Sequence, residues 1–299
     1  MLPLAQWLLK GQGQALAFVT VCFSVGYVFW PINIIAAAGL SLITLRQGAQ
    51  QSATIAALAL IPAAIIGYQL GGTYMPLMLG LSTLITSETL KQTRSWPFSL
   101  LALTGSAYAA AAAMLVFFNA ALLEQVTLMQ ELFAQINQQM ANQNEAQAAM
   151  MQLINDSLNT RFIAGIWGSM LVIMVFFGLV LARSWQAQLF NPGGFQQEFH
   201  QLRLGKADTL VYTITGLGLL SFDTSLMTWA WMSFFPLTIS AVALCHWVAK
   251  QRELRQHWYI IFYMLFILSD FVRLFLIVIA MLDASMNFRQ RISKQSPKA

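Results

Sequence analysis

The sequence predicts an all-α, polytopic transmembrane helix bundle of about eight or nine membrane helices, with an extracytoplasmic helical hairpin. We expect a single integral membrane domain over residues 1–299. Hydrophobic residues make up 58% of the chain and charged residues 9%, whereas charged residues are about 25% of an ordinary soluble domain. Long apolar runs recur along the chain and need lipid or protein around their whole circumference. The stretch between residues 95 and 160 contains no Lys or Arg.

This cation-free stretch predicts which side of the membrane each connection occupies. Loops that stay in the cytoplasm collect Lys and Arg, and translocated loops lack them. Residues 120–160, which are rich in Gln and Asn, therefore lie outside the membrane. The basic connections between other apolar runs stay inside and contact anionic headgroups. They account for the net charge of +5 without any nucleic-acid partner.

Nine apolar runs give the expected membrane helices in chain order. They are residues 15–30, 32–45, 53–68, 75–89, 96–123, 162–181, 208–222, 229–248 and 258–282. Pro31 separates the first two runs. Because proline removes a helical hydrogen bond and disfavours helix at the residue before it, we expect two short helices meeting there, or one kinked span.

The segment 120–160 carries two apolar stripes at helical spacing, which predict the two arms of the outer hairpin. The first stripe is Leu122, Val126, Met129, Leu132, Phe133, Ile136 and Met140, and the second is Met150, Leu153, Ile154 and Leu158. The stripes pack against each other or onto a partner. We prefer self-packing, because it needs no second protein.

Residues 184–207 form the longest basic connection, a cytoplasmic amphipathic loop. Asn191, Pro192, Gly193 and Gly194 predict a turn. The flanks of this turn each resemble a short amphipathic helix, and Phe195 lies on the apolar face of the second one. Such a segment lies in the membrane interface or docks on a cytoplasmic partner.

The last apolar run contains the strongest candidates for a ligand site. Asp270 and Arg273 lie near its middle and three residues apart, so they share a helix face. They form either a packing pair or the lining of a polar binding cavity, and Asn33 is a further candidate for that lining. As one helix the run measures about 38 Å, more than a ~30 Å hydrocarbon core. With nine crossings, the basic tail would lie outside. Either an early segment is re-entrant or the last run bends back, and we expect the tail inside.

The residues present do not point to catalysis. The chain has three His and two Cys residues that show no metal-ligand spacing, and it lacks a serine elbow and a phosphate-binding loop. We therefore expect no catalytic residues, no metal and no cofactor.

The C-terminal half resembles the YybS-like family of uncharacterised bacterial polytopic membrane proteins. The resemblance rests on the turn of residues 191–194 with Phe195, and on Asp283, Phe288 and Arg289 after the last run. Asn287 stands where the family has a second acid. The resemblance implies a bacterial inner membrane location. The layout of the N-terminal helices is similar to the substrate-binding subunits of energy-coupling-factor transporters, which implies a membrane coupling protein that docks on small-residue faces at Ala53, Ala57 and residues 102–113.

Two main hypotheses for function follow. The first is a non-enzymatic small-molecule-binding or transport component, with the ligand near Asp270 and Arg273. The second is a membrane scaffold or assembly factor that grips other proteins through the outer hairpin and the loop 184–207. An enzyme acting on lipid-linked substrates is least favoured, because no acid–base pair stands out.

Overall fold

The computed structural model describes residues 2–69, 75–141, 152 and 155–295, and every regular element in this part of the chain is a helix. The all-α prediction is confirmed. The helices are α1 (Leu2–Leu8), α2 (Gln12–Val25), α3 (Ile32–Gln47), α4 (Ala49–Gln69), α5 (Met75–Thr93), α6 (Trp96–Phe117), α7 (Asn119–Ala141), α9 (Thr160–Phe190), α10 (Gly194–Gln201), α11 (Lys206–Phe222), η1 (Thr224–Leu226), α12 (Met227–Gln251), α13 (His257–Leu268), α14 (Asp270–Met286) and α15 (Phe288–Gln295).

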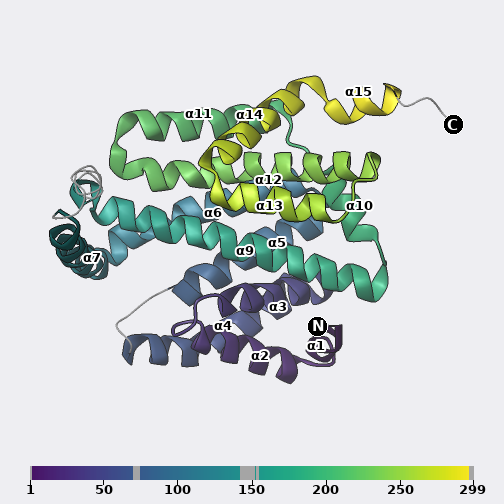
Figure 1. Cartoon of the computed structure of the whole chain (residues 1–299). Helices are drawn as coiled ribbons and strands as arrows, with labels where there is room; N and C mark the ends of the chain where they lie inside the picture. The colour runs from purple at the N-terminus through teal and green to yellow at the C-terminus, as the bar shows by residue number, and fades with distance from the viewer. Residues whose placement is uncertain (1, 70–74, 142–151, 153–154, 296–299) are drawn as a thin grey trace.

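Helix α9 is the axis of the bundle. It packs against α3, α5, α6 and α12. Figure 1 shows α1–α4 below α9 and α11–α14 above it. The helix is 31 residues long and buries small as well as large side chains. Gly178 allows a close approach of α9 to α3, because a Cβ there would lie 2.5 Å from Ala37 Cβ.

Within the described residues, four helices are long and apolar enough to cross a membrane, and up to six spans result if each of two bent pairs counts as one. These helices are compatible with a multi-pass membrane protein, but they are fewer than the eight or nine crossings expected from the sequence. The difference has a geometric cause. Helices α3 and α11 have 16 and 17 residues, so each is about 25 Å long, short of a ~30 Å core.

The break expected at Pro31 is confirmed. Helix α2 ends at Val25, and Pro31 is the N-cap of α3. Asn33 is only 2% exposed, and its amide Nδ2 donates to the Gly26 carbonyl oxygen at 3.2 Å. Asn33 therefore satisfies a backbone group freed at the helix break.

The turn of residues 191–194 is confirmed as the junction between α9 and α10. Gly193 has φ of +83°, a left-handed conformation that favours glycine. The prediction of a separate short helix before this turn is wrong, because α9 continues without a break to Phe190. The residues between 181 and 190 include neither Gly nor Pro, so nothing ends the helix there.

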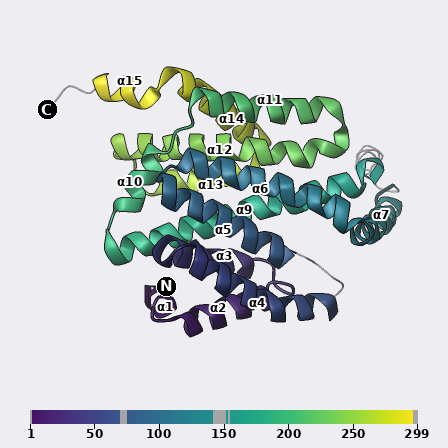
Figure 2. The same ribbon diagram turned by 180° about the vertical axis from the view of Figure 1, so that it is seen from behind.

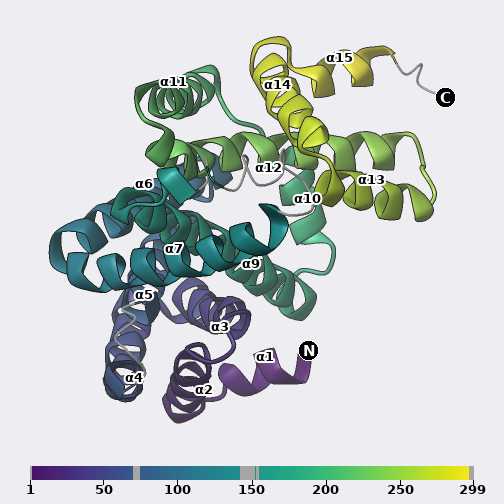
Figure 3. The same cartoon turned by 60° about the vertical axis from the view of Figure 1, so that its left-hand side comes forward.

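Helix α7 crosses the end of the bundle, as Figure 3 shows. Leu122 and Val126 are buried against the core, and Met129 and Phe133 pack beside them. Leu132, also predicted for this stripe, is 54% exposed. The stripe packs on the bundle through α6 and α9. Of the second predicted arm, Met150, Leu153 and Ile154 lie outside the described residues, so the hairpin stays a prediction.

The two ends of the bundle carry different elements. Figure 2 places α10 and α15 at one end and α7 at the opposite end. At the α10 end, the Arg46 guanidinium lies 3.8 Å from the centroid of the Phe190 ring. At the α7 end, Arg161 pairs with Asp223 at 3.4 Å. The expectation that the tail returns to the side of the basic loops therefore agrees with the position of α15 beside α10.

Candidate functional site

The main hollow near the C-terminal half is an apolar groove of about 820 Å³ between α9, α12 and α13, with α10 across one end. Figures 1 and 3 show α13 on one flank of the bundle beside α12. Helix α13 has no buried residue, so it stands away from α12 and leaves the space open. Phe176, Trp231, Phe235 and Phe266 are among the aromatic side chains that line it.

The length of the groove is close to the thickness of the hydrocarbon core of a membrane. Its lining on α12 extends from Thr228 to His246, which is about 27 Å at 1.5 Å per residue. The hydrocarbon core of a bilayer is ~30 Å thick. The groove therefore fits an elongated molecule lying along the helices.

Most polar side chains in the groove already have partners. Ser169 Oγ donates to the Thr228 carbonyl oxygen at 2.8 Å, and Thr238 Oγ1 donates to the Phe234 carbonyl oxygen at 3.0 Å. His246 Nε2 and the Tyr263 hydroxyl are 2.8 Å apart, so His246 is hydrogen-bonded within the chain. The Ser169 and Thr238 hydroxyl groups therefore offer the groove no free donor.

Asp270 and Arg273 lie at a helix break. The last apolar run bends by 106° between α13 and α14, so it is not one continuous helix. Ser269 caps α14 by accepting from the backbone N–H of Val272 at 3.4 Å. A serine followed by an acid in the first turn is a helix start signal. That signal lies within an apolar run, which hides it.

The two charged residues form an ion pair on one helix face, but only one of them reaches the groove. The Asp270 side chain is 78% exposed, whereas that of Arg273 is 35% exposed and lines the groove. Asn33 does not line it. The structure therefore does not bring the three predicted ligand residues into one site.

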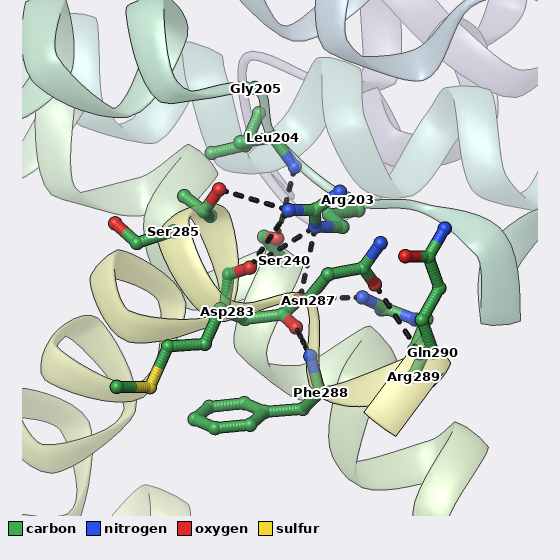
Figure 4. A network of polar contacts seen from close by, with 12 residues as sticks. Arg203, Leu204, Gly205, Ser240, Asp283, Ser285, Asn287, Phe288, Arg289 and Gln290 are labelled. Atoms are coloured by element: carbon green, nitrogen blue, oxygen red, sulfur yellow. Dashed lines mark hydrogen bonds and ion pairs between the residues drawn. The ribbon is translucent and has the colours of Figure 1, made fainter. Parts of the chain in front are cut away.

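Asp283 is the centre of a polar cluster that we call the clasp, formed by Asp283, Arg203 and Arg289 (Figure 4). Expected at the end of the membrane run, Asp283 is instead 1% exposed inside α14. Arg289 Nη1 donates to Asp283 Oδ2 at 2.6 Å, and Arg203 Nε lies 3.8 Å from the same oxygen. The backbone N–H of Phe288 donates to Asp283 Oδ1 at 2.9 Å.

The clasp ties the chain after α10 to the C-terminal helices. Arg289 donates to the carbonyl oxygens of His200 at 3.0 Å and Leu202 at 2.8 Å. Arg203 donates in return to the carbonyl oxygens of Asp283 at 3.0 Å and Ala284 at 2.9 Å. Burial lowers the pKa of Arg289, while the neighbouring Asp283 carboxylate acts in the opposite direction.

Sequence reasoning missed Arg203. It lies between Leu202 and Leu204, which are 2% and 1% exposed. An arginine flanked by two apolar residues in an otherwise polar loop was the available signal. Among the residues of the resemblance, Asp283, Phe288 and Arg289 come together in the clasp, and residues 191–194 form the turn that leads to it through α10.

His200 of α10 is a titrating group beside the clasp and the groove. Burial, Lys250 and Arg289 lower the pKa of its imidazole below the usual value. The unfolded chain therefore binds a proton at a higher pH than the folded protein does. This contribution to stability is complete above an unfolded pKa of about 6.5 and is lost as the pH falls below it.

We predict that the melting temperature falls between pH 7.5 and pH 5.5, and that His200→Gln makes the fall smaller. His257→Gln, at an exposed position on α13, is the control and leaves the slope unchanged. The readout is intrinsic tryptophan fluorescence during heating of the purified protein. An unchanged slope in His200→Gln contradicts the assignment.

Comparison with known proteins adds no identity: the chain matches no family model, no curated protein and no solved structure.

Proposed function

We propose that this chain is a membrane protein that binds an elongated, mostly apolar molecule in the groove between α9, α12 and α13. It would act as a binding or transport component, with no chemistry of its own, in a bacterial inner membrane. The observation that carries the proposal is the groove itself, with its length of about 27 Å along α12 and its volume of about 820 Å³ lined by aromatic and aliphatic side chains. Ligand sites in proteins are concave and mainly apolar, with a few polar groups.

The alternative of a scaffold that binds partners through the loop 184–207 has less support. Phe195 and Phe199, the apolar face of α10, pack against the chain's own core. The ring of Phe195 lies 6.3 Å from that of Trp96, between centroids. This face is therefore occupied within the chain and is not free for a cytoplasmic partner.

The groove predicts a matched pair of substitutions. Ile173 lines the groove and is 39% exposed, so tryptophan there fills the cavity without entering the packed core. We expect Ile173→Trp to weaken binding of oleyl alcohol and of oleate at least about tenfold, because the added ring competes for the space occupied by the chain. Binding is measured with radiolabelled ligands on purified protein in detergent.

Ile214→Trp is the control. Ile214 is 62% exposed on α11 and does not line the groove. It makes the same change in size on another lipid-exposed surface, and we expect unchanged affinity. Absence of saturable binding to the wild type, or equal weakening by both substitutions, would refute the proposal.

A further inference from the structure

We infer that the groove selects amphiphiles with an anionic end, and that Arg273 is the residue that binds this end. The inference rests on the proposed function and adds the chemical class of the ligand. The shared chemistry is a carboxylate or phosphate group attached to a hydrocarbon chain. It follows from the charges and unpaired donors of the groove.

The charge in the lining of the groove is of one sign. Arg273 is the residue that brings a full charge to the lining, and within the described part of the chain no Asp or Glu lines the groove. In a medium of low polarity, a cation attracts a counter-ion much more strongly than it does in water. A ligand with an anionic end is therefore favoured over a neutral or cationic one.

Asp270 neutralises only part of Arg273. A guanidinium presents five N–H donors, and one of its nitrogens, Nη2, forms the ion pair with Asp270 Oδ1. The Nε–H of Arg273 is buried and has no acceptor within the described residues. A buried donor without an acceptor costs about 1–3 kcal/mol. An anionic oxygen from a ligand would remove this cost.

The remaining polar groups do not compete for the same role. Thr228 Oγ1 donates to the Phe162 carbonyl oxygen at 3.0 Å, and the Ser169, Thr238 and His246 side chains have the partners given above. Gln196 and His200 lie on α10, whereas Arg273 projects from the first turn of α14. An anion bound at Arg273 therefore leaves the aromatic lining of α9, α12 and α13 to the hydrocarbon chain.

The test compares two ligands of equal chain length, oleate and oleyl alcohol, on the purified protein in detergent. A charge-assisted hydrogen bond contributes about 1.5–3 kcal/mol, which is roughly ten- to a hundredfold in affinity. We expect Arg273→Gln to weaken the binding of oleate by that factor and to leave the binding of oleyl alcohol unchanged. Retained binding of oleyl alcohol shows that the variant is folded. Arg273→Lys keeps the positive charge without the Nε–H. Its affinity for oleate should therefore lie between those of the wild type and Arg273→Gln.

Asp270→Asn separates ligand binding from packing. Removing the competing carboxylate should tighten the binding of oleate and leave the binding of oleyl alcohol unchanged. If Asp270→Asn and Arg273→Gln instead each weaken binding of both ligands, the pair only packs the helix and the inference is wrong. Equal binding of both ligands to Arg273→Gln and to the wild type also overturns it, while the groove proposal stands. Only absence of binding to the wild type removes both.

The source of the anionic amphiphile is decided by competition. Labelled oleate bound to the wild type is challenged with phosphatidylglycerol in mixed micelles, and with phosphatidylethanolamine as the zwitterionic control. Displacement by phosphatidylglycerol alone assigns the site to an anionic membrane lipid. Displacement by neither, with unlabelled oleate still competing, assigns it to a free fatty acid. Equal displacement by both lipids contradicts selection for an anion.

Discussion

Replacing Asp283 with alanine is expected to lower the free energy of unfolding by about 3 kcal/mol, at the lower end of the cost of removing one partner of a buried ion pair. Asp283 is 1% exposed, so its loss leaves the Arg203 and Arg289 guanidinium groups without their carboxylate in a largely dry site. The lower end applies because the Arg203 side chain is 30% exposed and keeps contact with solvent. Heating with tryptophan fluorescence as the readout measures the loss.

Asp223→Ala is the matched control for this change. Asp223 also pairs with an arginine and caps a helix, but its side chain is 34% exposed at the other end of the bundle. We expect a much smaller change in melting temperature, because exposed ion pairs are screened by solvent. A second readout is limited proteolysis after Arg289 or Arg291. Cleavage should be faster in Asp283→Ala, since Arg289 holds α15 against the carbonyl groups of residues 200 and 202. Unchanged melting and cleavage would show that the clasp contributes nothing.

Gly178→Ala is expected to destabilise the protein by about 1–3 kcal/mol, the cost of overpacking a filled interface. The added methyl group would lie 2.5 Å from Ala37 Cβ and 3.0 Å from the backbone carbonyl carbon of Ala37. Backbone atoms of a neighbouring helix cannot move aside as a flexible side chain can. The helices α3 and α9 must separate instead, and this weakens the contact between the N-terminal helices and the axis of the bundle.

Gly105→Ala tests whether this cost comes from the contact or from the loss of a helical glycine. Gly105 lies in α6 with nothing within 4 Å of a Cβ. Alanine is favoured over glycine inside a helix by about 1 kcal/mol, so this change should be neutral or stabilising. Opposite signs for the two substitutions support the close approach at Gly178. Equal effects on the melting temperature contradict it.

The local features of this fold were predictable because they depend on neighbours in sequence. Pro31 is the N-cap of α3, the turn of residues 191–194 contains the glycine that adopts positive φ, and the spacing of Asp270 and Arg273 puts them on one face. Each of these follows from backbone sterics or helical periodicity within a few residues.

The features that depend on distant residues were not predictable. Asp283 reads as a surface residue at the end of an apolar run, and its burial requires Arg203, which is far away in the sequence and joins a different helix pair. The groove depends on how α13 sits relative to α9 and α12, which hydrophobic periodicity does not encode. The break at Ser269 was hidden because its start signal, Ser269 followed by Asp270, lies within a long apolar run.

Helix α13 has no buried side chains, and this affects how a ligand would enter the groove. If α13 swings outward about the bends at its two ends, its side chains exchange protein neighbours for acyl chains of similar polarity, and no hydrophobic penalty opposes the movement. A hydrogen bond between His246 of α12 and Tyr263 of α13 spans the groove. If the groove binds an apolar molecule as proposed, a molecule already dissolved in the bilayer would enter it laterally, without passing through water.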